Sequence, residues 1–256
     1  MSATPILQRW ARGAIADVFE VIYPSCCAAC DELCAPGAWL CEKCDDEFHE
    51  LAQGACCVRC ASPLPESNAP CGRCKGIGLR PFARIGRLST YESTTKNLVH
   101  MIKYRHRWAT VDHLVNRLAE QSSVKSIMSD ANVIVPIPLH YFRAVSRGFN
   151  QSELIARRLS KKFRVPVMRV LRRKRRTISQ TAFHSRAART ANVRDVFELT
   201  LPDRLKGQRV VVVDDVMTSG ATLRSAAREI RRARPARIDA VVIATANPLK
   251  TDLVAI

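Results

Sequence analysis

The sequence of 256 residues predicts an α/β protein with a mostly parallel sheet and flanking helices, preceded by a small cysteine-rich segment. All eleven cysteines lie between Cys26 and Cys74. Strand-like apolar runs alternate with amphipathic helical patterns only after residue 80. The charge divides at the same place, since residues 1–80 carry 7 basic and 10 acidic side chains and residues 81–256 carry 34 and 13. We therefore predict a boundary near Arg80-Pro81 between parts of net charge −3 and +21.

Composition excludes several classes of protein. With 47% hydrophobic and 25% charged residues, the chain is globular rather than disordered. No apolar run approaches the roughly 18–20 residues of a membrane span. Charged residues interrupt the apolar pattern of the N-terminus, which argues against a signal peptide. An odd number of cysteines argues against a disulfide framework, so we expect a cytoplasmic protein.

The first expected element is an N-terminal amphipathic helix, assigned to residues 1–23. Its apolar stripe falls on positions 7, 10, 14, 15, 18 and 22, which is helical spacing. We expect this stripe to pack on one of the following domains.

The cysteine-rich segment, residues 24–80, is an internal repeat. Four C-x2-C pairs occur, and moving the first two pairs by 30 residues superimposes them on the last two. Each C-x2-C turn presents two sulfurs, and two turns supply the four thiolates of a tetrahedral zinc site. The repeat predicts a double zinc ribbon with two structural zinc ions. The eight predicted ligands are Cys27, Cys30, Cys41, Cys44, Cys57, Cys60, Cys71 and Cys74.

The pairing of the four turns has two solutions. The repeat favours sequential pairing, because each 30-residue unit then carries a complete ligand set; cross-braced pairing is the alternative. Four cysteines leave no open position, so both zinc ions would be structural and would supply folding energy. The three remaining cysteines are expected to be small buried fillers. They are Cys26, Cys34 and Cys56.

Residues 81–256 show the alternation typical of a parallel sheet with right-handed crossovers. Apolar, β-branched runs predict strands, and apolar residues at spacings of three and four predict helices. In order, the predicted elements are helices near 94–105 and 109–121, a strand over 131–138, a helix over 150–163, a strand-like run over 165–171, a strand over 210–213, a helix over 222–233 and a strand over 238–246.

The segment Val210–Thr222 carries most of the functional information. A buried strand leads to two acidic residues and then to a turn of small residues that opens a helix. Backbone N–H groups at a helix N-terminus favour a phosphate. Carboxylates at the carboxyl end of a strand in an open α/β sheet can accept hydrogen bonds from vicinal hydroxyls. A phosphorylated ribose fits both halves of this segment.

The same segment resembles the phosphoribosyl-pyrophosphate (PRPP) signature of type I phosphoribosyltransferases. The order of motifs along the whole chain is similar to that of the ComF family, which includes competence proteins and GntX-type proteins. Besides the cysteine repeat and the signature, those motifs are Pro136-Ile-Pro138, Arg147-Gly-Phe-Asn-Gln151, Gln180 and Arg189-x-x-Asn192. The resemblance implies a type I phosphoribosyltransferase-like domain over 81–256.

The resemblance also implies roles for individual residues. Asp214 and Asp215 would be the catalytic carboxylates that hold the ribose 2′- and 3′-hydroxyls. The pyrophosphate would meet the loop after the strand near residue 135, with Mg²⁺ bridging it to the ribose. The implied 5′-phosphate residues are Thr218, Ser219, Gly220, Ala221 and Thr222, and the implied pyrophosphate residues are Pro136, Ile137, Arg143 and Arg147.

The stretch 157–194 is strongly basic. Between Glu153 and Asp195 the chain holds 14 basic residues and no acidic one. This stretch could close over PRPP or track single-stranded DNA. Two functions remain open: transfer of phosphoribosyl from PRPP with release of Mg-pyrophosphate, or PRPP sensing by a non-catalytic protein that binds single-stranded DNA. The ComF resemblance implies a role in DNA uptake or nucleotide-related metabolism, with partners in the uptake machinery.

Overall fold

The computed structural model describes residues 25–67, 69–105, 108–139, 148–173 and 196–246. The predicted N-terminal helix lies outside these ranges. Within them, no helix is both long enough and apolar enough to cross a membrane.

A parallel four-stranded sheet forms the centre of the molecule, in the order β1-β6-β5-β2. Both central strands are long and consist mainly of buried, β-branched residues, as in sheets covered on both faces. A single parallel bridge between Ile134 and Val167 continues the sheet beyond β2. The strands are β1 (Ile85–Thr90), β2 (Val133–Pro136), β5 (Arg209–Met217) and β6 (Arg237–Thr245).

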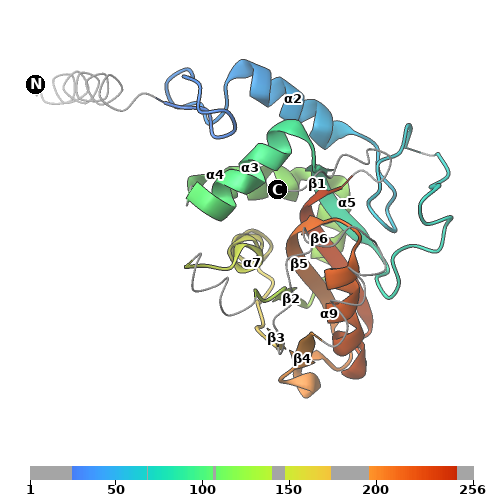
Figure 1. The fold of residues 1–256 in the computed structure, drawn as a ribbon. Coiled ribbons are helices and arrows are strands. Elements are labelled where there is room, and N and C mark those ends of the chain that lie inside the picture. The colour runs from blue at the N-terminus through green and yellow to red at the C-terminus, as the bar shows by residue number, and fades with distance from the viewer. Residues whose placement is uncertain (1–24, 68, 106–107, 140–147, 174–195, 247–256) are drawn as a thin grey trace, which may run out of the picture.

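Helices cover both faces of the sheet. Figure 1 shows α3, α4 and α7 on one side and α9 on the other. The first face is covered by α3 (Ser93–Arg105), α4 (Trp108–Glu120), α5 (Ser122–Ser129) and α7 (Gln151–Phe163), whose buried side chains share one apolar cluster. The second face is covered by α9 (Ala221–Arg232), by the short helix Pro202–Leu205 and by an antiparallel pair of short strands, β3 (Leu171–Arg173) and β4 (Phe197–Leu199).

Two parts of this sheet differ from the sequence prediction. The run 165–171 was predicted to be one strand, but it contributes only the bridge at Val167 and the first residue of β3. Strand β1 was not predicted, because Gly86 and Arg87 interrupt its apolar pattern. A Cβ at Gly86 would lie 2.8 Å from the side chain of Val124, so the glycine lets α5 pack closely on β1.

The cysteine-rich segment forms two similar ribbons, residues 25–54 and 55–80. An antiparallel bridge joins Cys26 to Leu33 in the first ribbon, and its counterpart 30 residues later joins Cys56 to Pro63 in the second. The first ribbon adds a helix that was not predicted, α2 (Glu42–Gln53), which begins inside its second C-x2-C turn.

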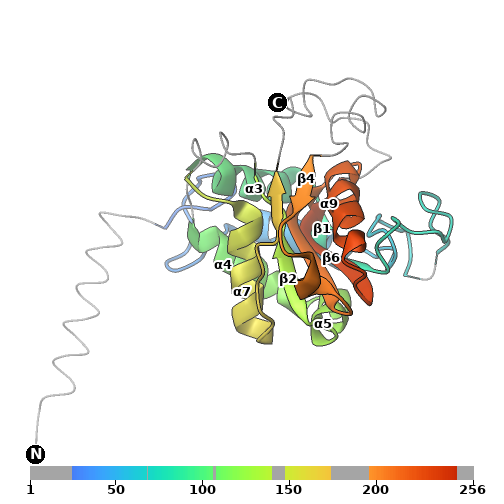
Figure 2. The ribbon, with the colours of Figure 1, turned by 90° about the horizontal axis from the view of Figure 1, so that it is seen from below.

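Each ribbon packs on a different face of the sheet. In the first ribbon, Trp39 stacks on His113 of α4 at 4.8 Å and meets Phe48 of α2 edge-on at 5.7 Å. Buried residues of this ribbon therefore join the apolar cluster of α3, α4, α5 and α7. The second ribbon joins the cluster under α9, and Figure 2 shows it in cyan on that side of the sheet. The ribbons are thus part of both cores rather than a separate appendage.

Candidate functional site

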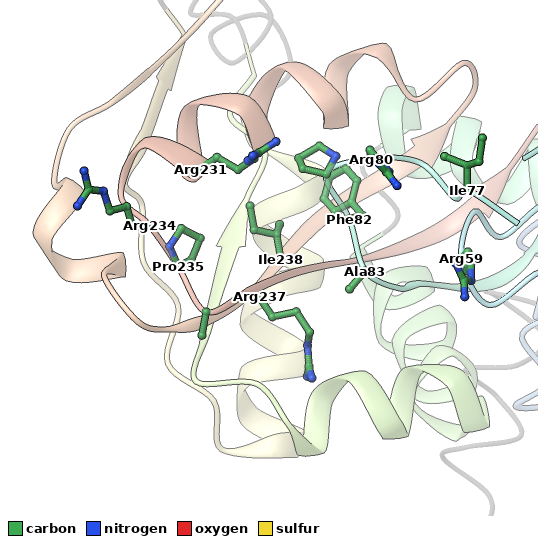
Figure 3. A pocket seen from close by; sticks show the side chains of 12 residues that line it. Arg59, Ile77, Arg80, Phe82, Ala83, Arg231, Arg234, Pro235, Arg237 and Ile238 are labelled. Atoms are coloured by element: carbon green, nitrogen blue, oxygen red, sulfur yellow. The ribbon is translucent and has the colours of Figure 1, made fainter.

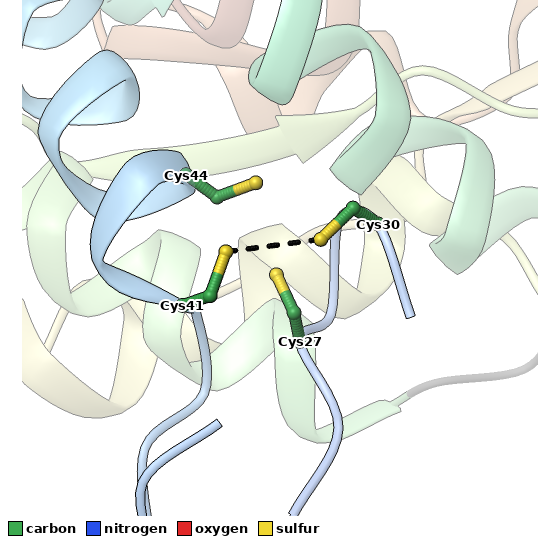
Figure 4. A group of neighbouring side chains, drawn as sticks. All are labelled: Cys27, Cys30, Cys41 and Cys44. Atoms are coloured by element: carbon green, nitrogen blue, oxygen red, sulfur yellow. Dashed lines mark hydrogen bonds between the residues drawn. The ribbon is translucent and has the colours of Figure 1, made fainter. Parts of the chain in front are cut away.

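The eight predicted ligands form two groups of four, Cys27/Cys30/Cys41/Cys44 and Cys57/Cys60/Cys71/Cys74. In each group all four sulfurs lie within 4.8 Å of one another, and Figure 4 shows the first group converging on one point. Neighbouring sulfurs are 3.6 to 3.7 Å apart. A tetrahedron with Zn–S bonds of about 2.3 Å has edges of about 3.8 Å, so the spacing fits zinc. Each group consists of two C-x2-C pairs that are consecutive in the chain, as sequential pairing predicts. The two groups support two structural zinc ions.

The other three cysteines were expected to be buried fillers, and this expectation was wrong. Cys26 is exposed, whereas Cys34 and Cys56 are only partly buried. Cys26 and Cys56 lie at the ribbon bridges, where the backbone pairing rather than apolar packing determines their position.

The two candidate carboxylates, Asp214 and Asp215, lie inside β5 rather than after it. Strand β2 ends at Pro136, which pairs with Val213, and among the described residues β5 has no strand neighbour on that side beyond this point. The gap in the sheet opens where the carboxylates begin. Asp214 Oδ1 accepts a hydrogen bond from its neighbour's N–H at 2.9 Å, and Asp215 Oδ1 accepts one from Val216 at 2.7 Å.

Lys103 of α3 lies beside the acidic pair, although no motif in the sequence pointed to it. Its Nζ lies 2.7 Å from Asp215 Oδ2, and its side chain is 20% exposed. Burial opposes the charge of Lys103, but the attraction of Asp215 outweighs burial and raises the pKa of the ammonium. One cation thus serves two adjacent carboxylates.

Asp214 is held differently from Asp215. Ser152 Oγ at the start of α7 donates to Asp214 Oδ1 at 2.8 Å. Burial raises the pKa of Asp214 to about 7, and the charge of Asp215 acts in the same direction. The two adjacent carboxylates therefore differ, because Asp215 contacts an ammonium whereas Asp214 accepts from a hydroxyl.

The end of the motif Arg147–Gln151 ties the loop after β2 to the carboxylates. Asn150 caps α7 by accepting from Ser152 N–H at 3.1 Å, and its Nδ2 donates to Ile137 O at 2.9 Å. Gln151 is 3% exposed, and its Nε2 has no hydrogen-bond partner among the described residues. It lines a small cavity together with Asp215 and apolar side chains of α3, α4 and β6. The motif therefore places one unpaired donor beside the acidic pair.

The predicted phosphate residues, 218–222, lie where β5 leads into α9: residues 218–220 form the connecting turn, called the phosphate turn below, and Ala221 and Thr222 begin the helix. Gly220 is the N-cap of α9 with φ +72°, a conformation that favours glycine. Ser219 Oγ accepts from Ala221 N–H at 3.4 Å. The first turn of α9 thus presents its N-terminus at the same edge of the sheet as Asp214 and Asp215, as an anion site requires.

The second ribbon contacts this turn. Arg73, between the ligands Cys71 and Cys74, donates through Nη2 to Thr218 O at 3.0 Å and through Nη1 to Ser62 Oγ at 3.2 Å. A Cβ on Gly220 would lie 2.6 Å from Leu79 Cδ2. The ribbon thus holds the phosphate turn from outside.

A buried arginine links the same ribbon to the sheet. Arg87 of β1 is 2% exposed and donates to Thr245 Oγ1 at 2.7 Å, and Thr245 Oγ1 donates to Ala61 O at 3.0 Å. Burial lowers the pKa of Arg87, while Cys56 and Cys60 favour its charged form. A zinc centre with four thiolates carries a charge of about −2, which this guanidinium partly neutralises.

The predicted pyrophosphate residues are only partly described. Ile137 is buried, and its N–H donates to Val213 O at 2.9 Å, while Pro136 has no N–H. Neither residue offers a free backbone donor, so direct contacts would come from later residues of the loop. Arg143 and Arg147 lie outside the described residues.

The basic stretch 157–194 is described only as far as residue 173, so Gln180, Arg189 and Asn192 also lie outside the structure. Several of its arginines pair with acids from other parts of the chain. Arg157 and Arg169 contact Glu153, Arg158 contacts Asp112, and Arg172 contacts Glu198. The described part of the stretch is therefore less available to a polyanion than the sequence indicated.

Comparison with known proteins agrees with the two-part organisation. Residues 114–253 match the model of the phosphoribosyl transferase domain, and residues 18–75 match the double zinc ribbon domain. The DNA utilization protein YhgH of Escherichia coli is 29% identical, over 82% of this chain and 92% of that protein. Competence protein F of Haemophilus influenzae is 24% identical over 75% and 84%, and competence protein ComFC of Bacillus subtilis is 26% identical over 77% and 79%.

Proposed function

This chain belongs to the phosphoribosyl transferase family, as a ComF-type member with a double zinc ribbon, and we propose that it binds PRPP between its acidic pair and the start of α9. The observation that carries the proposal is the position of Asp214, Asp215 and the phosphate turn at one edge of the sheet, beyond the end of β2. Open α/β sheets bind ligands at this edge.

The ribose and the 5′-phosphate of PRPP have candidate contacts among the described residues. Asp214 and Asp215 accept hydrogen bonds from the ribose 2′- and 3′-hydroxyls. The backbone N–H groups and hydroxyls of residues 218–222 hold the 5′-phosphate. The unpaired Nε2 of Gln151 is a further donor beside the ribose.

A transfer reaction is consistent with this arrangement. The bond from ribose C1 to pyrophosphate breaks, and an acceptor nucleophile forms the new bond to C1. Mg²⁺ would be held mainly by oxygens of PRPP and would neutralise the leaving pyrophosphate, because Lys103 and Ser152 already engage the two carboxylates. The protein's residues orient the ribose and fix its 5′ end.

The proposal is tested by calorimetry of PRPP binding with Mg²⁺ present. Replacing both Asp214 and Asp215 by Asn keeps their shape but removes two charge-assisted acceptors. At roughly 1–3 kcal/mol each, their loss should weaken binding at least about 30-fold. Asp203→Asn, an exposed carboxylate outside the site, is the control. Unchanged affinity in the double variant would contradict the proposal.

PRPP affinity should also depend on the ionisation of Asp214. Because the pKa of Asp214 is raised to about 7, its carboxyl is largely protonated at pH 6 and ionised at pH 8. The ionised form accepts stronger, charge-assisted hydrogen bonds from the ribose hydroxyls than the protonated form does, so affinity should rise up to roughly 10-fold over this range. PRPP itself also titrates, and Asp214→Asn reports that contribution alone. The difference between the two pH profiles measures Asp214; identical profiles would refute its role.

Binding of single-stranded DNA is a second candidate function. It is favoured by the net charge of +21 on residues 81–256 and by the DNA-related names of the relatives. Neutralising phosphates releases counterions, which gives affinity without sequence preference. DNA uptake or DNA use would then be the process in which the protein acts.

A further inference from the structure

A hollow of about 600 Å³ lies between the second ribbon and the end of α9, away from the PRPP site. Five arginines line it: Arg59, Arg80, Arg231, Arg234 and Arg237. Figure 3 shows them spread across the hollow, from the second ribbon to the turn after α9. No aspartate or glutamate is among its lining residues.

Three of these arginines have no carboxylate partner among the described residues: Arg80, Arg231 and Arg234. In the described part of the chain Asp130 and Asp239 pair with Arg84 and Arg237, which leaves the rest of the hollow without a counterion. Arg59 donates to Gly76 O at 2.6 Å, a neutral partner that leaves its charge uncompensated. Several like charges around one hollow repel one another, and a bound polyanion removes that repulsion.

The position of the hollow separates it from the PRPP site. The phosphate turn lies at the N-terminus of α9, whereas Arg231 and Arg234 lie at and beyond its last turn. A helix of 12 residues is about 18 Å long, so the two sites are at opposite ends of the domain. The parallel strands β5 and β6 lead to the same conclusion. Arg237 and Ile238 are at the start of β6, whereas the acidic pair lies past the middle of β5, toward its carboxyl end.

We propose that this hollow binds the phosphate backbone of single-stranded DNA. Dispersed guanidinium groups match an extended polyanion better than one phosphate. Apolar side chains between them offer surfaces for sugars and bases, including Ile77, which is 62% exposed, and Pro235. A flexible single strand can enter a hollow, whereas duplex readers need an element that projects into a groove. The inference rests on the DNA-binding candidate and gives it a site other than the stretch 157–194.

The test uses the full-length protein and a fluorescent oligothymidylate, followed by anisotropy at several salt concentrations. In the variant Arg80→Ala/Arg231→Ala, two phosphate contacts are lost. Affinity at low salt should fall at least about 10-fold, and the slope of log K against log salt should fall by about 1.4, since each contact contributes roughly 0.7 for single strands. Both side chains are exposed, so unfolding is not expected, and thermal melting checks this. Arg231→Glu should weaken binding more than Arg231→Ala.

The matched control is Arg228→Ala/Arg232→Ala. It removes the same charge from exposed residues of α9 that do not line the hollow. Affinity in this control should fall less than about threefold, because only the general field changes. Excess unlabelled pyrophosphate should displace the oligonucleotide poorly; complete displacement by equimolar pyrophosphate would mean a site for small phosphates and would overturn the proposal.

The experiment distinguishes a failure of the DNA-binding function from a failure to assign its site to the hollow. If the parent protein binds oligothymidylate and the two double variants bind it equally, the hollow is not the DNA site although DNA binding stands. If the parent does not bind at low salt, both the DNA candidate and the hollow are refuted. PRPP binding, measured by calorimetry on the same variants, should be unchanged in either case.

Discussion

Replacing Cys27 by Ser should reduce the zinc content of the purified protein from two equivalents per chain to one. Cys27 is fully buried and belongs to the first group of four sulfurs. Because zinc binding supplies the folding energy of such a ribbon, the whole of residues 25–54 should lose its order. Trp39 and Phe48 would then leave the cluster that they share with α4.

The expected loss is about 5 kcal/mol or more, which corresponds to a fall in the melting temperature of roughly 10–20 °C for a protein of this size. Metal analysis and thermal melting measure the two effects. Cys26→Ser is the control, since this adjacent cysteine is exposed and outside both groups. It should keep two zinc equivalents and the melting temperature of the parent. A Cys27→Ser protein that also keeps two equivalents would disprove the ligand assignment.

The second large effect is expected at Lys103. Lys103→Met keeps the length of the side chain but leaves Asp214 and Asp215 without their cation. Removing one partner from a buried ion pair leaves an uncompensated charge, so the free energy of unfolding should fall by roughly 3 kcal/mol. Urea denaturation measures it. Lys96→Met, on the same helix and without an ion pair to any described residue, should change stability little.

The loss of unfolding free energy in Lys103→Met should increase as the pH rises. Without the ammonium, the folded-state pKa of Asp214, which burial and the charge of Asp215 already raise to about 7, rises further above its unfolded value. Below about pH 7 the Asp214 carboxyl is largely protonated in both proteins, so the penalty from Asp214 is small there; it grows as the pH rises above 7, where the carboxyl ionises in the parent but less readily in the variant. Equal stability of Lys103→Met and Lys96→Met at pH 8 would show that the ion pair contributes nothing.

The sequence was most informative where a spacing or pattern is local. The C-x2-C repeat predicted both groups of sulfurs, and apolar periodicity predicted six of the helices and strands after residue 80 to within three residues at each end. The type I phosphoribosyltransferase-like fold with a preceding double zinc ribbon is confirmed. Strand β1 was not predicted, because an arginine in a sequence normally indicates an exposed position. In the structure Arg87 is buried, and Thr245 and the cysteines of the second ribbon stabilise it there.

Charges were the least predictable part of the site. Lys103 belongs to no motif, and its role follows from the packing of α3 against the end of β5. The stretch 157–194 contains no acidic residue. In the folded chain, however, Arg158 forms an ion pair with Asp112, and Arg172 forms one with Glu198. Conversely, the arginines of the hollow are scattered along the sequence and gather only in the fold. Sequence distance does not measure the separation of charges in a folded chain.

The hydrogen bond from Arg73 to Thr218 has a thermodynamic consequence that applies in both directions. Arg73 is held by the zinc ligands on either side of it, and Thr218 belongs to the turn proposed for the 5′-phosphate. Suppose that zinc, by ordering the second ribbon, favours the turn geometry that binds PRPP and so increases the affinity for PRPP by some factor. PRPP must then increase the affinity of the second ribbon for zinc by the same factor. Zinc and PRPP would then each increase the affinity of the protein for the other. In a cell with too little of one of them, a smaller fraction of this protein would carry the other.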